Sequence, residues 1–268
     1  MDVRDLGALD GDVILFGGPT SNLQAFEALL SEAEARGIPA SRIISTGDLV
    51  AYAADGAGVV ERVRDLGCHV VAGNCEKELA AGSADCGCGF DEGSTCAVLA
   101  DGWFAHARRT LNEEHRAYLG ACPDRIVFRA FGKRVVVIHG AATRINRFLW
   151  PVTAEADLEA ELSVLEDQVG PFDVVVAGHS GLAFQRPVGN RLWVNTGSLG
   201  MPENDGDTAT RFVVMTEAGF ETVRLTYDHA AAATAMTAAG LSDGYDVALL
   251  TGYWPSEDVL PAELRRAS

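Results

Sequence analysis

The sequence predicts an α/β protein with a two-sheet core and helices outside it. In the first half of the chain, short apolar strands alternate with polar loops and amphipathic helices, which is typical of a parallel sheet. The second half is richer in strands. The chain has 268 residues, of which 48% are hydrophobic and 22% charged. That is enough apolar material to bury a large core in one α/β domain of generous size.

The elements of the first half follow from their residue patterns. Val13 to Phe16 is a compact apolar strand, and the turn Gly17 to Asn22 breaks it. A helix is expected from about Leu23 to Arg36, with Ser21 and Gln24 as a capping box at its start. The same reasoning predicts the strand Arg42 to Ser45, a short helix that ends at Gly67 and the strand His69 to Ala72.

The segment Ala81 to Cys96 has a different composition. It is rich in Gly, Ser, Cys and acidic residues and lacks apolar periodicity, so we interpret it as an insertion. Because it follows the Gly73-Asn74-Cys75 loop and a short helix, we expect it beside the active crevice, where it caps the site and shapes access.

The rest of the chain contains few helices and many strands. Helical patterns cover Trp103 to Arg109, Asn112 to Cys122 and Asp157 to Gln168. The expected strands are Ile126 to Arg129, Lys133 to Ile138, Val174 to Ala177, Ala183 to Val188, Arg191 to Val194, Thr210 to Thr216 and Phe220 to Leu225. Gly189-Asn190 predicts a hairpin turn. We divide the chain into a core domain, residues 1–228, and an Ala-rich helical appendage, residues 229–268.

Charge and composition limit the function. Lys plus Arg number 21 and Asp plus Glu 38, which gives a net charge of −17. This balance argues against non-specific nucleic-acid binding and against anionic membrane surfaces. The sequence has no apolar stretch of transmembrane length and no signal-peptide pattern at its start, so we expect a cytoplasmic protein. Nothing in the sequence indicates the oligomeric state.

Four predicted strands end in loops that pair a glycine with a potential metal ligand. The loops are Gly47-Asp48, Gly73-Asn74, His139-Gly140 and Gly178-His179. One such loop is an ordinary turn, but four in succession predict a site. One Asp, one Asn and two His suit a divalent transition metal ion such as Mn, Fe or Zn.

This succession of loops resembles the calcineurin-like metallophosphoesterase superfamily, especially its compact bacterial branch. The family patterns G-D-x-V-x-Y, G-N-H-[DE], V-H-G, G-H-x-H and N-P-G-S-V-G are matched by Gly47 to Tyr52, Gly73 to Glu76, Ile138 to Gly140, Gly178 to Gly181 and Asn195 to Gly200. The resemblance covers about Val13 to Leu225. It implies a four-layer α/β/β/α sandwich of two mixed sheets.

The departures from the family pattern fall on one of its two metal sites. Where the family has D-x-H, this chain has Gly18-Pro19-Thr20, and Gly181 replaces the second His of G-H-x-H. The resemblance implies that these positions, with Asp48 as a bridging ligand, would have held the first metal. The ligands of the other metal match residues that are all present, namely Asp48, Asn74, His139 and His179. The resemblance therefore implies one divalent ion.

The resemblance also implies a function, that of a metal-dependent hydrolase of a small phosphorylated substrate, either a phosphomonoester or a phosphodiester. The ion would activate a bound water. Asp48, Asn74, Cys75 and His139 are the candidate catalytic residues. Cys75 stands at the family's G-N-H histidine, which resembles a leaving-group acid, and a thiol is a weak replacement. The alternative is a catalytically inactive scaffold or ligand-binding module, as in a retromer subunit with this fold. Retention of four ligands favours the enzyme.

Several residues allow two interpretations. The turn Gly17 to Asn22 is either a phosphate-binding nest, with Asn22 contacting substrate, or a plain strand-to-helix turn without the Lys of a P-loop. Arg144 and Arg147 either clamp a phosphate or are solvated surface residues. The cysteines Cys75, Cys86, Cys88 and Cys96 are either ligands of a second metal centre in or beside the insertion or ordinary thiols that bind no metal.

Overall fold

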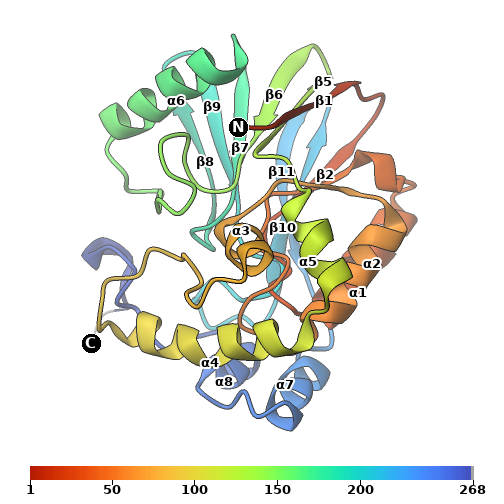
Figure 1. The fold of residues 1–268 in the computed structure, drawn as a ribbon. Helices are drawn as coiled ribbons and strands as arrows, with labels where there is room; N and C mark the ends of the chain where they lie inside the picture. Colours follow the sequence, from red (N-terminus) through yellow and green to blue (C-terminus); the bar gives the residue numbers. More distant parts are fainter. Residues whose placement is uncertain (267–268) are drawn as a thin grey trace.

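The computed structural model describes residues 1–266 and contains two mixed β-sheets between layers of helices (Figure 1). One sheet has the strand order β1-β5-β6-β7-β9-β8 and the other the order β11-β10-β2-β3-β4. The strands of the first sheet are β1 (Val3–Ala8), β5 (Arg125–Ala130), β6 (Lys133–Val137), β7 (Val174–Ala177), β8 (Ala183–Val188) and β9 (Arg191–Thr196). Those of the second are β2 (Val13–Phe16), β3 (Ile43–Ser45), β4 (His69–Val70), β10 (Thr210–Thr216) and β11 (Gly219–Leu225).

The helices cover the outer faces of both sheets. Helix α6 packs on the six-stranded sheet, whereas the other helices gather on the side of the five-stranded sheet (Figure 1). Their bounds are α1 (Leu23–Ala35), α2 (Gly56–Leu66), α3 (Asn74–Ala81), α4 (Thr95–Thr110), α5 (Glu113–Gly120), α6 (Glu155–Val169), α7 (His229–Ala238) and α8 (Tyr245–Thr251). Short 3-10 helices cover Ala40–Arg42 and Ala262–Leu264. Among residues 1–266, no helix has both the length and the apolar character needed to cross a membrane.

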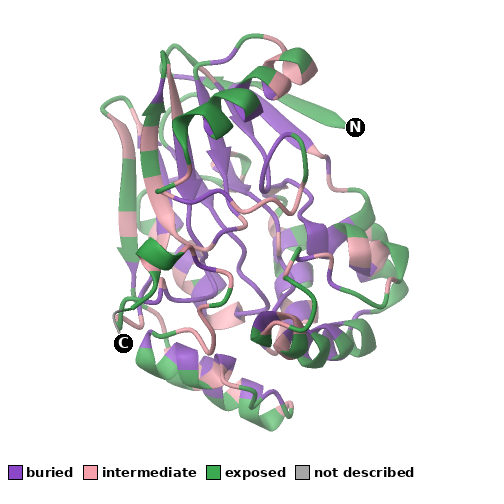
Figure 2. Cartoon of the chain, turned by 90° about the vertical axis from the view of Figure 1, so that its left-hand side faces the viewer, coloured by how far each residue is buried: buried purple, intermediate pink, exposed green. Residues whose placement is uncertain are grey.

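Side-chain alternation along the strands produces three apolar layers. In β2, Val13 and Leu15 face the other sheet, whereas Ile14 and Phe16 face the helices. All four side chains are fully buried because both faces of the strand are covered. One layer lies between the sheets and the other two lie between a sheet and its helices. The buried strands and the exposed outer faces of the helices are visible in Figure 2. The four-layer α/β/β/α sandwich of two mixed sheets is therefore confirmed.

The structure corrects some local expectations. Helix α1 is capped by Asn22, whose Oδ1 accepts a hydrogen bond from the Ala25 N–H at 3.0 Å, and not by a Ser21–Gln24 capping box. Strand β1 was not expected, because it is an exposed edge strand without an apolar run. The predicted helix Trp103 to Arg109 is longer than expected and begins at Thr95. Residues 82–94 therefore form the irregular part of the proposed insertion.

The C-terminal segment shares the core of the main domain. Met236 of α7 and Leu249 of α8 are buried in the same apolar layer as Phe26 of α1. Helices α7 and α8 also contact each other, and α7 contacts α1. Residues 229–266 are therefore integrated into one side of the sandwich and do not form a detached unit.

The buried side chain of Leu249 provides a test of this integration. We expect Leu249→Ala to lower the free energy of unfolding by about 2–5 kcal/mol, because it leaves a cavity in the main apolar layer. Leu250→Ala is the matched control, since Leu250 is 50% exposed. Chemical denaturation followed by circular dichroism measures both. A main unfolding transition that Leu249→Ala leaves unchanged would show that the segment is energetically separate.

Candidate metal centre

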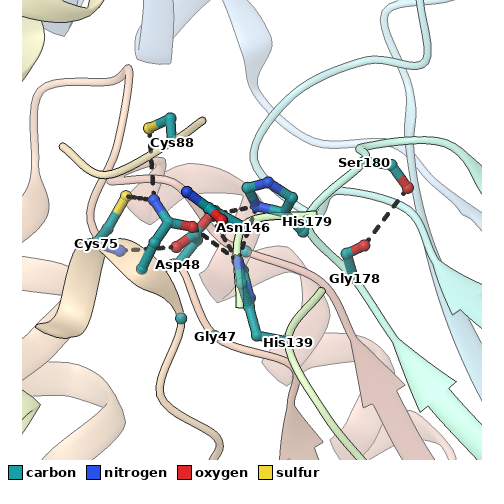
Figure 3. A network of polar contacts seen from close by, with 12 residues as sticks. Gly47, Asp48, Cys75, Cys88, His139, Asn146, Gly178, His179 and Ser180 are labelled. Carbon is teal, nitrogen blue, oxygen red and sulfur yellow. Dashed lines mark hydrogen bonds and ion pairs between the residues drawn. The ribbon is translucent and has the colours of Figure 1, made fainter. Parts of the chain in front are cut away.

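Loops from both sheets meet at one edge of the sandwich and bring the predicted ligands together (Figure 3). Asp48 follows β3 and Asn74 follows β4, both in the five-stranded sheet. His139 follows β6 and His179 follows β7, both in the six-stranded sheet. Parallel strands carry their loops at the same sheet edge, so residues far apart in sequence converge there.

The atoms of the four residues surround the Nε2 atom of His139. It lies 3.3 Å from Oδ2 of Asp48, 3.1 Å from Oδ1 of Asn74 and 3.0 Å from Nδ1 of His179. Oδ2 of Asp48 lies 3.9 Å from Nδ1 of His179. Ligand atoms of Asp48, His139 and His179 all lie within 4.8 Å of one another. The structure therefore places the four predicted ligands around a common point.

Hydrogen bonds fix the orientation of two of these ligands. Nδ1 of His139 donates to the carbonyl oxygen of Thr46 at 2.7 Å, because a carbonyl can only accept, and this directs the lone pair of Nε2 into the centre. The amide nitrogen of Asn74 donates to the carbonyl oxygen of Cys86 at 3.0 Å, which turns its Oδ1 toward His139. Four atoms with lone pairs thus converge, one from each residue. A proton on one imidazole nitrogen could form a hydrogen bond to only one of the other atoms, which would leave the rest without a partner. A divalent transition metal ion satisfies all four, so the donor set fits such an ion.

The charges of the centre are strongly coupled. Burial alone would raise the pKa of Asp48, but the charges and hydrogen bonds of His139 and His179 hold it well below its usual range. Burial lowers the pKa of His139, yet the neighbouring Asp48 carboxylate outweighs it and raises that pKa overall. The pKa of His179 is lowered, first by burial and then by the charge of His139. An ionised carboxylate beside two imidazoles therefore forms the centre.

Backbone strain is concentrated at this edge of the sandwich. Among residues 1–266, seven non-glycine residues have a positive φ. Four of them line the cavity at the centre, namely Thr20, Asp48, Tyr52 and His179. The φ angles of Asp48 and His179 are 56° and 63°. Such conformations each cost on the order of 1–3 kcal/mol and persist where surrounding contacts impose them. The loops are therefore held in the geometry that directs these two side chains inward.

Glu76 imposes this geometry on the first two loops, a role that the motif comparison alone did not assign. Its carboxylate is fully buried and accepts hydrogen bonds from the backbone N–H groups of Asp48, Leu49 and Gly73 at 2.7, 2.8 and 2.7 Å. Burial and the charge of Asp48 raise the pKa of Glu76 to about 7. Both oxygens are occupied, so Glu76 positions the loops and is not available as a substitute metal ligand. A Glu three residues after a helix-starting glycine is the sequence signal for this contact.

The irregular segment at residues 82–94 contacts the centre through its cysteines. Asn74 Nδ2 lies 3.5 Å from Cys88 Sγ and 3.4 Å from Cys75 Sγ. Asn146 Nδ2, from the loop after β6, donates to the carbonyl oxygen of Gly87 at 2.9 Å. The segment therefore lies beside the centre, as its position in the sequence predicted. Within the described residues, the cysteines do not form a three-ligand cluster of the kind found for Asp48, His139 and His179.

Cys75 is buried behind the centre. A hydrogen bond with Cys88 lowers the pKa of the Cys75 thiol. Burial and the charges of Asp48 and Glu76 outweigh it, and they raise that pKa well above its usual value. Its backbone N–H donates to Oδ1 of Asp48 at 3.3 Å. Cys75 is not among the residues that line the cavity. The structure thus gives Cys75 a backbone contact to Asp48 and no direct path to a leaving group.

The positions of the missing family ligands are closed by other parts of the chain. A Cβ atom at Gly18 would lie 2.6 Å from the carbonyl oxygen of Asp48. At Gly181, a Cβ atom would lie 3.2 Å from the ring of Trp254, which belongs to the C-terminal segment. Thr20 contributes only a hydroxyl, and its Oγ1 is buried without a hydrogen-bond partner among residues 1–266. This side of the centre offers neither an imidazole nor a second carboxylate at those positions.

The structure does not bring the predicted substrate residues Asn22 and Arg144 into the cavity. The amide of Asn22 is buried, and besides capping α1 it donates to the carbonyl oxygen of Gly200 at 2.9 Å. Arg144 is exposed and does not line the cavity. Arg147 pairs with the fully buried Glu161 at 2.5 Å and with Asp157 at 3.0 Å, which explains it as a structural ion pair.

An open cavity of about 710 Å³ adjoins the centre. Asp48 and His179 form part of its wall, together with residues from the irregular segment, the loop after β6 and the C-terminal segment. Much of the remaining wall is aromatic, and the rings come from Tyr52, Phe90, Phe148, Trp150, Tyr245 and Trp254. A ligand of moderate size can therefore reach Asp48 and His179 from solvent.

Comparison with known proteins agrees with this fold. A sequence profile described as the calcineurin-like phosphoesterase superfamily domain matches residues 21–219. An uncharacterised protein of Methanocaldococcus jannaschii is 28% identical over 228 residues, which cover 78% of this chain and 84% of that protein. A crystal structure of a metallophosphoesterase from Sphaerobacter thermophilus has a TM-score of 0.68 at 22% identity, over 91% of this chain and 100% of that one. A hypothetical protein from Pyrococcus horikoshii has a TM-score of 0.72 at 14% identity, over 92% and 99% of the two chains. The profile match covers most of the chain, and this protein therefore belongs to the calcineurin-like phosphoesterase superfamily.

Proposed function

We propose that this protein is a metal-dependent phosphoesterase that hydrolyses a small phosphomonoester or phosphodiester with a single divalent ion, Mn, Fe or Zn. The observation that carries the proposal is the convergence of the Asp48, Asn74 and His179 ligand atoms on Nε2 of His139. Bound there, the ion supplies a Lewis acid for the phosphoryl group and acidifies a water molecule.

The chain's own residues prepare this centre. Thr46 holds His139 in the tautomer that offers Nε2, and Cys86 holds Asn74 with its oxygen inward. The backbone N–H of Cys75 orients Asp48, so we assign Cys75 a positioning role and not that of a leaving-group acid. Access from the 710 Å³ cavity allows a phosphoryl group to approach Asp48 and His179.

The surroundings of Gly18 and Gly181 support a single ion. An aspartate at position 18 would collide with the Asp48 backbone, and a histidine at position 181 would meet Trp254. Asp48 alone is a weak anchor for a second ion, because the remaining coordination positions would be filled by water.

Metal stoichiometry tests the single-ion proposal. We expect one ion per chain after metal-replete purification, measured by inductively coupled plasma mass spectrometry and titration calorimetry. His139→Ala and His179→Ala should each weaken binding by at least about 10-fold, because each removes one ligand. His229→Ala, outside the centre, is the matched control. Two tightly bound ions per chain would contradict the proposal.

Hydrolysis distinguishes the enzyme from a catalytically inactive scaffold or ligand-binding module. We expect metal-loaded protein to release p-nitrophenol from p-nitrophenyl phosphate or from its phosphodiester analogue, followed by absorbance. Chelation should abolish turnover, and re-addition of the ion should restore it. Protein that holds one ion but turns over neither compound above the His139→Ala background would favour the non-catalytic reading.

Glu76→Gln tests the positioning role of the buried carboxylate. An amide has one acceptor oxygen, so its NH₂ group would face a backbone N–H donor and leave that donor unpaired. We expect a loss of about 2–4 kcal/mol in the free energy of unfolding, measured by denaturant titration. Metal affinity should fall as well, because Asp48 loses its backbone anchor. Glu78, a half-buried glutamate of the same helix, provides the control as Glu78→Gln. An unchanged stability would show that the three hydrogen bonds contribute little.

A further inference from the structure

The cavity beside the metal centre has a wall that restricts its substrate. Three of its rings form a stacked array next to His179. Phe148 stacks on His179 with ring centroids 4.3 Å apart, on Trp150 at 5.4 Å and on Phe90 at 6.1 Å. The planes of Phe148 and Trp150 differ by only 6°. Such parallel faces favour the stacking of another flat ring.

Further aromatic surface comes from the C-terminal segment. The Trp254 indole lies against Gly181, and its Nε1 donates to the carbonyl oxygen of Pro202 at 2.6 Å. Tyr245 contacts Tyr52 with ring centroids 4.5 Å apart and the ring planes tilted by 32°. Trp254 is therefore held at two points, because its backbone N–H also donates to Asn204 Oδ1 at 2.7 Å. The aromatic wall is therefore fixed in place before a ligand arrives.

The residues that line the cavity carry little charge. Among the described residues that line it, none is Lys or Arg, and Asp48 is the charged residue present. With a divalent ion bound beside one carboxylate, at most about one unit of positive charge faces the ligand. A phosphomonoester dianion is usually balanced by additional cationic side chains. A phosphodiester monoanion needs no more positive charge than the centre provides.

We infer that the site selects a phosphodiester monoanion with an aryl ester group, which lies against the aromatic wall formed by Phe90, Phe148, Trp150 and Trp254. This inference rests on the proposed phosphoesterase function and specifies its substrate class. The buried thiol of Cys75 agrees with it, because an aryloxide leaves without prior protonation more readily than an alkoxide. Water adds to phosphorus, the P–O(aryl) bond breaks with its electron pair on oxygen, and the products are a phosphomonoester and a phenol.

Binding of diesters to the metal-loaded full chain tests the inference, and released phenol is measured in the same samples so that the heat of binding is separated from the heat of turnover. The probes are diphenyl phosphate, dicyclohexyl phosphate and phenyl phosphate, each titrated by calorimetry. The first two share charge and approximate ring size, so their ratio isolates the flat ring. We expect diphenyl phosphate to bind about 10-fold more tightly than dicyclohexyl phosphate, and more tightly than phenyl phosphate. Equal affinities for the first two, or preference for phenyl phosphate, would overturn the inference.

Substitutions in the aromatic wall test which rings produce the preference for diphenyl phosphate. Phe148→Leu and Trp254→Leu keep apolar volume but remove a flat face, so each should reduce the diphenyl-to-dicyclohexyl ratio to about 1–3-fold. Tyr253→Leu is the control, because Tyr253 is exposed and does not line the cavity. Metal affinity is measured in parallel, because Phe148 contacts His179 and because Trp254→Leu loses an anchoring hydrogen bond. If both variants kept the wild-type ratio of affinities for diphenyl and dicyclohexyl phosphate, the aromatic wall would not be the cause of the preference.

The two proposals fail in different ways. If the preference for diphenyl phosphate is present and depends on Phe148 and Trp254, but no phosphoester is hydrolysed, the inference on recognition stands and the phosphoesterase function fails. If phosphoesters are hydrolysed but aryl and cyclohexyl groups bind equally, the function stands and the aryl selectivity fails.

Discussion

The geometry of the candidate metal centre depends on one buried carboxylate, that of Glu76. It joins the loop after β3 to the start of α3 through three backbone N–H donors. Without it, those donors would be buried without partners, at a cost of about 1–3 kcal/mol each. The contact also holds Asp48 in its left-handed conformation, with its side chain directed at His139. Loop closure and ligand orientation are therefore consequences of the same interaction.

The centre also depends on how the two sheets pack, because each sheet supplies half of the ligands. The β-branched layer between the sheets, which includes Val13, Ile44 and Val137, fixes the distance between them. At the sheet edge the loops are in direct contact. A Cβ atom at Gly178 would lie 2.2 Å from Oγ1 of Thr46, and the Thr46 carbonyl oxygen binds His139. The ligand spacing is thus set by the sandwich and adjusted by glycine at the closest approach.

The sequence carried enough information to predict the sandwich and the convergence of Asp48, Asn74, His139 and His179, because both depend on strong local patterns. Apolar strands such as Val13–Phe16 ended in Gly-containing loops at the expected places. Other features depend on tertiary contacts that no local pattern reveals. The edge strand Val3–Ala8 has few buried side chains, and the amide of Asn22 is occupied by Gly200, which is remote in sequence. The aromatic wall likewise combines Phe90, Phe148 and Trp254 from three separate segments.

The contact between Trp254 and Gly181 constrains how this site can change during evolution. A Cβ atom at position 181 would lie 3.2 Å from an indole that is anchored to Pro202 and Asn204, so a histidine there would fit only if the indole shifted. A single substitution at position 181 would carry the cost of the positive φ and of the tight contact with the indole without gaining a complete ligand set, because a Cβ atom at position 18 would lie 2.6 Å from the Asp48 carbonyl oxygen. Side-chain ligands at both positions would therefore require several changes at once, including a shift of the C-terminal segment that carries Trp254. The packing of the C-terminal segment therefore disfavours larger side chains at position 181, so that this loop and the C-terminal segment can change only together.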